Sequence, residues 1–317
     1  MIVSQPTLSD LISMGTLYSA WERVRENNGC AGVDRVTIPQ FAAALETNLR
    51  RLAYEIESDI YCPLPLLRIL VDKGNGESRA LSIPTVRDRT AQAAALNILE
   101  PVFEAQFDDC SYGYRRGRSV RQAVMQVRDY YSQGYCWLVD ADIDAYFDRV
   151  PHDRLLEKIA ALLEDEGIQR LIRLWLEADI WDGEQVSHMT VGLPQGSVIS
   201  PVLANLYLDE FDDAMLKKGM RLVRYADDFV ILCNTREKAE QAARLTDEIL
   251  DSMGLELDES DINTFDAGFR FLGVTFFRSL TLVPFECERR SRRVLYVPPA
   301  LDLATYRRAA DSGNRRS

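Results

Sequence analysis

The feature that most constrains this chain is a pair of adjacent carboxylates, Asp227 and Asp228, set between two short apolar runs. The runs 222–225 and 229–233 are rich in β-branched and aromatic residues, which predicts two strands joined by a hairpin turn. An isolated Asp-Asp pair is most often a solvated turn, because aspartate favours turns. Beside a buried surface, however, two unpartnered carboxylates are costly, and their hard oxygens suit magnesium. The pair therefore indicates either an ordinary turn or a metal site.

Composition is that of an ordinary globular protein. Of the 317 residues, 47% are hydrophobic and 27% are charged, and no apolar run reaches the length of a membrane span. The six cysteines are scattered and only His152 and His188 supply imidazoles, which argues against zinc, disulfide or triad chemistry. The N-terminus lacks a signal-peptide pattern. We therefore expect a cytoplasmic protein with no membrane partner.

The charge pattern bears on nucleic-acid binding. A net charge of −12 argues against a free-standing nucleic-acid binder, which usually carries a basic excess. Arginines nevertheless cluster in 115–128 and in the tail 289–316. Two explanations fit: a basic track on an acidic body, or a partner that supplies further basic surface.

Periodicity and turn residues predict a mixed α+β body. Helices are expected over residues 7–28, 37–56, 84–107, 119–132, 198–216, 236–253 and 301–310, with two more within 153–178. Strands are expected over residues 66–71, 79–83, 137–142, 269–277 and 281–284, besides the hairpin. No Pro-rich or Ser-rich linker divides the chain, so we expect two lobes of one body.

A third carboxylate, Asp142, lies at the end of the strand predicted over 137–142. Three carboxylates from separate strands can hold two magnesium ions about 3.5–4 Å apart, as nucleotidyl transfer requires. The loop 111–119 combines aromatic residues, glycines and arginines, a mixture that can stack on bases and neutralise phosphates. Lys73 and Arg79 on the hairpin 66–83 are either surface charges or phosphate contacts.

Taken in order, the motifs of this chain resemble those of bacterial reverse transcriptases of the group II intron lineage. They are Gly32–Asp34, Arg79–Arg89, Ser111–Arg115, Asp142–Asp148, Gly192–Pro201, Tyr225–Asp228 and Phe271–Gly273. The resemblance implies a right-hand polymerase of the α+β class with an antiparallel palm sheet and a reduced or absent thumb. It assigns 1–135 to fingers with an N-terminal helical extension and 136–284 to the palm. Residues 285–317 would form a basic tail, partial thumb or linker.

The resemblance also implies roles for the carboxylates. Asp142, Asp227 and Asp228 match the catalytic ligands of two Mg²⁺ ions, and Ile143 matches a metal-binding backbone carbonyl. Asp142 is the match because the family's aromatic gate, which favours deoxynucleotides by blocking a 2′-hydroxyl, lies five residues further on, at Phe147.

Further residues match the nucleotide and nucleic-acid contacts of the family. Gln195 and Gly196 match the lining of the incoming-nucleotide site, and Lys73 and Arg79 match residues that hold its triphosphate. Arg115 and Arg118 are expected to meet template phosphates. The implied substrates are an RNA template, a DNA or RNA primer and deoxynucleoside triphosphates.

The chain departs from the family pattern in three places. Ala80 and Arg116 replace prolines, which the fold should tolerate. The Lys-Thr pair expected after Gly254–Leu257 is absent, because the chain reads Asp258–Thr264 there. About 44 residues follow Gly273, which leaves little room for a thumb.

This compact form is similar to reverse transcriptases associated with CRISPR adaptation, and implies the adaptation integrase complex as partner. Alternatives are an intron-derived or antiphage-defence reverse transcriptase, a terminal transferase, and a non-catalytic RNA-binding scaffold on the same fold.

Overall fold

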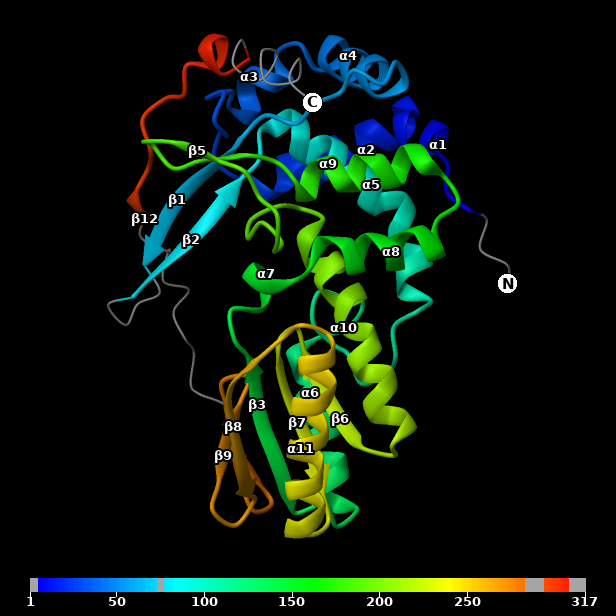
Figure 1. The fold of residues 1–317 in the computed structure, drawn as a ribbon, viewed down its shortest axis with the longest axis vertical. Coiled ribbons are helices and arrows are strands. Elements are labelled where there is room, and N and C mark those ends of the chain that lie inside the picture. Colours follow the sequence, from blue (N-terminus) through cyan, green and yellow to red (C-terminus); the bar gives the residue numbers. More distant parts are fainter. Residues whose placement is uncertain (1–4, 73–76, 283–293, 308–317) are drawn as a thin grey trace.

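A computed structural model describes residues 5–72, 77–282 and 294–307, and Figure 1 shows its two parts. In that view a helix-rich upper part holds the N-terminal helices and a twisted β-hairpin. A lower part holds the sheet that carries the carboxylates. Helix α10 (Ser200–Lys217) runs from the upper part into the lower one. No helix among the described residues is long and apolar enough to cross a membrane.

The lower sheet has the strand order β6-β7-β3-β8, and each neighbouring pair is antiparallel. Its strands are β3 (Trp137–Ile143), β6 (Arg221–Tyr225), β7 (Asp228–Cys233) and β8 (Leu257–Thr264). Side chains alternate between the faces along each strand. Val139 and Ile231 enter the main core, whereas Leu138 and Val230 enter a second one. The antiparallel palm sheet and the α+β class predicted from the sequence are confirmed.

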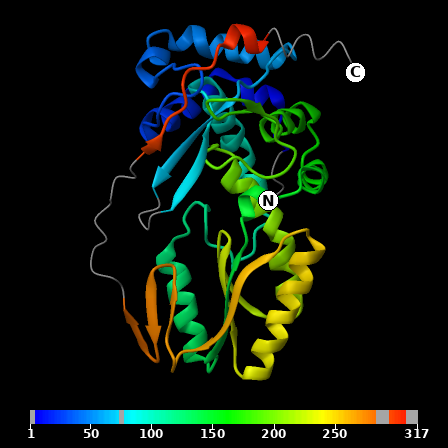
Figure 2. The same cartoon turned by 60° about the vertical axis from the view of Figure 1, so that its left-hand side comes forward.

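Helices cover both faces of this sheet. On the main-core side lie α10 and α11 (Arg236–Ser252). On the other side lies α6 (Val120–Ser132), which packs through Ala123 and Val127. The small sheet of β9 (Phe269–Phe271), β10 (Val274–Phe277) and β11 (Leu280–Leu282) closes the second core and appears in orange beside α6 in Figure 2.

The upper sheet is built around the hairpin of β1 (Leu66–Asp72) and β2 (Ser78–Ile83). Along its other edge, β1 pairs in parallel with β4 (Ile180–Trp181) and antiparallel with β12 (Val294–Tyr296). A further strand, β5 (Val186–Ser187), pairs with β4. The segment that follows β12 remains on this part, because Arg35 and Trp181 donate hydrogen bonds to the carbonyls of Pro298 and Pro299 at 2.5 and 2.8 Å.

Most of the remaining helices pack on one another in the upper part. The remaining helices are α1 (Leu8–Ile12), α2 (Met14–Asn27), α3 (Ile38–Ala42), α4 (Leu45–Glu57), α5 (Val86–Glu104), α7 (Tyr146–Arg149), α8 (His152–Leu162) and α9 (Glu166–Leu176). The helix predicted over 7–28 is broken at Ser13, whose hydroxyl accepts a hydrogen bond from the Thr16 amide and begins α2. The helix predicted over 37–56 is likewise two helices.

Several short elements were not expected from the sequence: β4, β5, α7, β8 and β12. Of these, β8 matters most for the site, because it occupies the edge of the lower sheet where the Lys-Thr pair was expected. Its Asp261 is the Cα partner of Asp140 on β3. The edge therefore brings two carboxylates opposite each other, a pairing that destabilises a sheet.

Candidate active site

Asp227 lies in the two-residue turn between β6 and β7, and Asp228 begins β7 directly after it. The turn is closed by the pair Tyr225 and Asp228. Ala226 has a φ of 62°, a left-handed conformation that hairpin turns usually give to glycine, asparagine or aspartate. An alanine there carries a strain of about 1–2 kcal/mol, so the surrounding structure must hold it in place.

A buried polar network holds this turn. The Arg224 side chain is fully buried and donates to the Ala226 carbonyl at 2.9 Å and to Asn205 Oδ1 at 3.0 Å. Its other guanidinium nitrogens donate to both carboxylate oxygens of Asp212, at 2.7 and 2.5 Å. Asn205 in turn donates to the Gly113 carbonyl at 2.6 Å. Gly113 lies against the turn so closely that a Cβ there would stand 2.4 Å from the Ala226 nitrogen.

The three carboxylates predicted as metal ligands share one electrostatic environment. Burial, with Asp140, Asp142 and Asp227 as further contributors, raises the pKa of Asp228 to about 7. Burial, with Asp227 as a contributor, raises the pKa of Asp142 to about 6. The pKa of Asp227 is also raised by burial, although Arg79 opposes the shift. These carboxylates thus repel one another, and a bound cation would relieve that repulsion.

The donor chemistry fits magnesium, since carboxylate oxygens and a backbone carbonyl are the hard ligands this ion prefers. Asp142 and Asp227 line one pocket from β3 and from the hairpin turn. Among the described residues, however, no three acidic, histidine or cysteine side chains are already grouped as a metal site. Asp142 Oδ1 instead accepts a hydrogen bond from the Ile143 amide at 3.0 Å. Ion binding would therefore require side-chain rotation.

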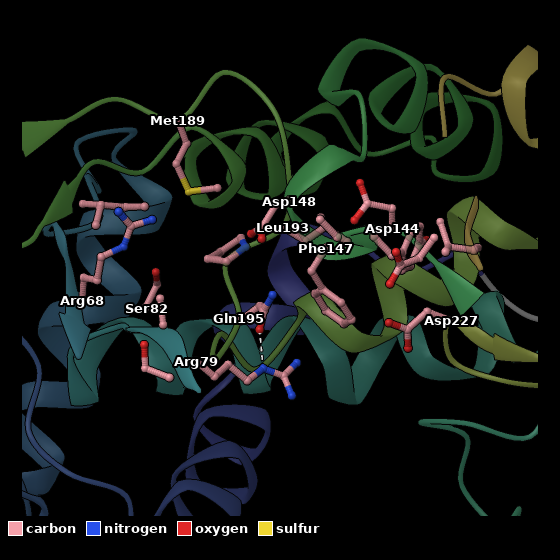
Figure 3. A pocket seen from close by; sticks show the side chains of 18 of the residues that line it. Arg68, Arg79, Ser82, Asp144, Phe147, Asp148, Met189, Leu193, Gln195 and Asp227 are labelled. Atoms are coloured by element: carbon pink, nitrogen blue, oxygen red, sulfur yellow. Dashed lines mark hydrogen bonds between the residues drawn. The ribbon is translucent and has the colours of Figure 1, made fainter. Parts of the chain in front are cut away.

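The pocket at the carboxylates has a volume of about 620 Å³ and extends from the lower sheet to the β1–β2 hairpin. Arg79 on β2 and Gln195 from the loop before α10 meet in it, with Arg79 Nε donating to Gln195 Oε1 at 2.6 Å. In Figure 3 the Phe147 ring lies between Gln195 and Asp227. One pocket therefore combines acidic metal donors with a cationic and amide-bearing wall.

The loop that carries Gln195 is locked onto β2. The Ser82 amide donates to the Gln195 carbonyl at 2.7 Å. Gly196 has a φ of 113°, and a Cβ there would stand 3.1 Å from the Ser82 carbonyl oxygen. Both observations require glycine at this position, since a side chain would be strained and crowded.

Phe147 combines the features of a core residue and of a pocket wall. It is 6% exposed, and its ring lies edge-on to Tyr146 at 5.8 Å and to Tyr114 at 6.4 Å between centroids. It also lines the pocket together with Asp142. The two aromatic neighbours pack edge-on against the ring, an arrangement that suits the gate that the sequence predicts.

The basic residues predicted to meet nucleic acid differ in their surroundings. Arg115 has a side chain only 3% exposed, and its guanidinium nitrogens donate to Glu104 and to the carbonyls of Phe107, Asp108 and Ser111. It is held as a structural arginine, which leaves it no accessible donor for a template phosphate.

Arg118 is more accessible. Its side chain is 23% exposed, pairs with Asp109 and lies over the Tyr112 ring at 5.4 Å. Lys73, predicted to hold the triphosphate, lies outside the described residues.

Sequence reasoning missed several residues at this site. Arg68 on β1 and Asp258 on β8 line the pocket, and Asp140 and Arg224 act on the carboxylates from the sheet. Of these residues, only Arg224 could have been found from the sequence, because an arginine within an apolar strand needs an acidic partner. The other three depend on strand pairing that the local sequence does not specify.

Comparison with known proteins shows which family the chain belongs to. Residues 71–276 match the family model described as reverse transcriptase (RNA-dependent DNA polymerase). Protein YkfC of Escherichia coli is 31% identical over 288 residues, which cover 78% of this chain and 76% of YkfC. The group II intron-encoded protein LtrA of Lactococcus lactis is 31% identical over 210 residues, or 65% of this chain and 34% of LtrA.

Two solved structures are also similar to this chain. A chain of a partial Cas6-RT-Cas1–Cas2 complex is 29% identical with a TM-score of 0.49, covering 78% of this chain and 42% of that one. Telomerase from Candida albicans is 12% identical with a TM-score of 0.54, over 69% of this chain and 46% of the telomerase chain, and shows the shared fold alone. The resemblance inferred from the motifs is therefore confirmed, and the chain belongs to the reverse transcriptase (RNA-dependent DNA polymerase) family.

Proposed function

We propose that this protein extends a primer 3′-hydroxyl with deoxynucleotides on an RNA template. The observation that carries the proposal is that Asp142 on β3 and Asp227 in the β6–β7 turn line one pocket with Arg79 and Gln195. Carboxylates at one end and a cation at the other are what a metal-bound triphosphate requires.

In this proposal Asp142, Asp227 and Asp228 hold two magnesium ions, with the Ile143 carbonyl as a further ligand. When bound, magnesium activates the primer hydroxyl and offsets the charge that develops on the triphosphate. The protein's contribution is to keep the Asp227 turn fixed through Arg224, so that the carboxylates need only rotate.

The opposite wall would position the nucleotide. Arg79, and Lys73 beyond the described residues, would bind triphosphate oxygens. Gln195 would leave its hydrogen bond with Arg79 when the nucleotide enters, and Gly196 would allow close approach of the backbone. Phe147 would exclude a ribose 2′-hydroxyl by occupying the space it needs.

Primer extension on an RNA template with magnesium and deoxynucleotides tests the proposal. Wild type should extend the primer, whereas Asp227→Asn with Asp228→Asn should reduce extension below detection. Asp213→Asn is the matched control, because Asp213 pairs with Lys217 on the exposed side of α10. An inert wild type, tested with its partners, would favour a non-catalytic scaffold. Extension without template would favour a terminal transferase.

A second proposal concerns the biological setting, namely spacer acquisition from RNA beside a CRISPR adaptation integrase. It rests on the sequence resemblance to compact CRISPR-associated reverse transcriptases. Co-purification with both integrase subunits is the expected result. A genomic locus that holds an intron and no CRISPR array would contradict it and favour the intron-derived alternative.

A further inference from the structure

A second cavity lies behind the nucleotide pocket, between α2 and α5. We call it the α2–α5 cavity; it has a volume of about 450 Å³. Arg23, Glu26 and Asn27 line it from α2, Arg89 from α5, and Val198 from the loop before α10. Its charged lining residues leave one net positive charge, since Glu26 offsets one of the two arginines.

Arg89 is an arginine buried without an acid. The residue is 6% exposed, its Nη2 donates to the Cys30 carbonyl at 2.5 Å, and its buried Nε has no hydrogen-bond partner. No ion pair of Arg89 is found in the part of the chain that the structure describes. Burial lowers the pKa of Arg89, and the nearby Cys30 and Asp34, neither of which forms an ion pair with it, only partly oppose that shift.

Arg87, two residues earlier in the same helix, is the internal comparison. Its guanidinium pairs with Glu55 and Asp88, both at 2.9 Å. Burial opposes its charge too, but Asp88, Tyr61 and Glu55 together outweigh that effect and the pKa of Arg87 is raised. Arg87 is thus paired with one acid from α5 and one from α4, whereas Arg89 has no such ion pair among the described residues.

The backbone around Arg89 makes room for its guanidinium. A Cβ at Gly29 would stand 2.4 Å from Arg89 Nη1, so the glycine allows the guanidinium to reach this position. At the rim, Arg23 is exposed and its Nη1 donates to Asn97 Oδ1 at 2.5 Å. A buried, uncompensated guanidinium beside a second arginine is suited to a phosphate, which it can bind through charge-assisted hydrogen bonds.

The cavity shares one loop with the nucleotide pocket. Gln92, one turn after Arg89, accepts hydrogen bonds from Ser197 Oγ and the Val198 amide, both at 3.0 Å. Val198 lines the cavity, and Gln195 lines the nucleotide pocket. In a polymerase the primer ends at the catalytic carboxylates, so a strand that continues past the incoming nucleotide is the template.

We propose that the α2–α5 cavity binds a backbone phosphate of the template strand ahead of the incoming nucleotide, with Arg89 and Arg23 as its ligands. The proposal rests on the proposed polymerase function and gives it a second nucleic-acid contact. A phosphate there would supply the acid that Arg89 lacks and would fix the template against the loop that carries Gln195.

The test uses primer–template duplexes with a short single-stranded template overhang. In each, one overhang phosphate is replaced by an uncharged methylphosphonate, with 2′-O-methyl ribose at that residue. Binding to the full chain is measured by fluorescence anisotropy across a salt series. At one overhang position, the replacement should weaken wild-type binding about tenfold, the effect of losing one charge-assisted hydrogen bond. The same replacement should cost Arg89→Met nothing further.

Arg23→Gln is the second variant, since its exposed position keeps the fold intact if Arg89→Met unfolds. It should lose most of the effect at the same phosphate and lower the salt slope by about one. Arg25→Gln, exposed on α2 and paired with Glu22, is the matched control and should behave as wild type. Thermal unfolding of each variant separates lost binding from lost fold.

The outcomes separate this site from the polymerase proposal. If the variants keep the full wild-type sensitivity at each overhang phosphate while primer extension persists, the cavity proposal is overturned and the polymerase stands. If the phosphate effect depends on Arg23 and Arg89 but no condition gives extension, the polymerase proposal fails and the phosphate site stands.

Discussion

Arg224 and Asp212 form a two-hydrogen-bond ion pair that is sealed from solvent, with side chains 0% and 1% exposed. The same guanidinium bonds the carbonyl of Ala226, the residue before Asp227. A buried ion pair adds little stability by itself, because desolvation offsets its attraction. Its value here is positional, since it fixes a strained turn that carries a proposed metal ligand.

Replacing Arg224 by methionine should destabilise the protein by about 3–5 kcal/mol, because Asp212 would remain buried without a partner. Urea unfolding measures this loss. Arg224→Lys keeps the charge but cannot bond both Asp212 and Ala226 in the same geometry. It should lower kcat and weaken Mn²⁺ binding, which electron paramagnetic resonance measures. The fold-change in each of these two quantities should exceed the fold-change in the KM for nucleotide. Arg221→Lys, exposed on the same strand, is the control, and equal effects of the two lysine variants would contradict this role.

The raised pKa values of Asp142, about 6, and Asp228, about 7, predict a pH effect on stability. Both exceed the ordinary value of 3.8, so the folded protein holds protons that the unfolded chain releases. The free energy of unfolding without metal should therefore fall as pH rises from about 4 to about 7. Thermal unfolding of wild type against Asp228→Asn measures the difference, and a rise across this window would contradict it.

The same carboxylates predict how magnesium and protons compete. At limiting magnesium, the extension rate should fall as pH is lowered through about 7 to 6, because protonated carboxylates cannot hold the ion. Excess magnesium should shift this fall in rate to lower pH. If excess magnesium does not shift the pH at which the rate falls, the titrating group is not one of these carboxylates.

Phe147→Val should reduce discrimination against ribonucleotides while keeping most of the packing around Tyr146 and Tyr114. The measurement is the ratio of kcat/KM for a deoxynucleotide and its ribonucleotide. Tyr114→Phe, which retains the edge-on ring, should leave the ratio unchanged. If Phe147→Val also leaves it unchanged, the ring is a core aromatic and not a gate.

Asp261→Asn should lower the pKa of Asp140, which burial, together with Asp261 and Asp142, raises to about 6. Carboxyl-carbon NMR titration measures this change. Asp266→Asn is the control, since Asp266 pairs with Arg278 at the surface. An unchanged titration of Asp140 would show that the cross-strand pair does not couple the two carboxylates.

How much of the structure can be predicted from the sequence depends on how far apart in the chain the interacting residues lie. The hairpin at Asp227 and the strand end at Asp142 were predictable, because alternation and turn chemistry act over a few residues. Gly196 was assigned to the nucleotide site by the family resemblance alone, and its positive φ was not predicted. The break at Ser13 was not predicted either, since a cap inside a continuous apolar pattern leaves the helical period almost unchanged.

The missed parts depend on partners far away in sequence. Asp258–Thr264 reads as an acidic surface segment, and only pairing with β3 makes it a strand. The sequence predicts that Arg115 contacts template phosphates, because the neighbouring residues do not show that its guanidinium donates to Glu104 and to nearby backbone carbonyls. Arg89 could not be distinguished from Arg87 in the sequence, since both neighbour Asp88 and only the fold shows that Asp88 and Glu55 pair with Arg87.

The pairing of β12 with β1 also has a consequence during synthesis. Leu70 pairs with Tyr296, a residue far later in the sequence. Because domains begin to fold as the ribosome releases them, the upper sheet stays incomplete until β12 has emerged. The edge of β1 that β12 will cover is meanwhile open to other strands. Ribosome-bound chains that stop before β12 should therefore bind chaperones longer than chains that include it.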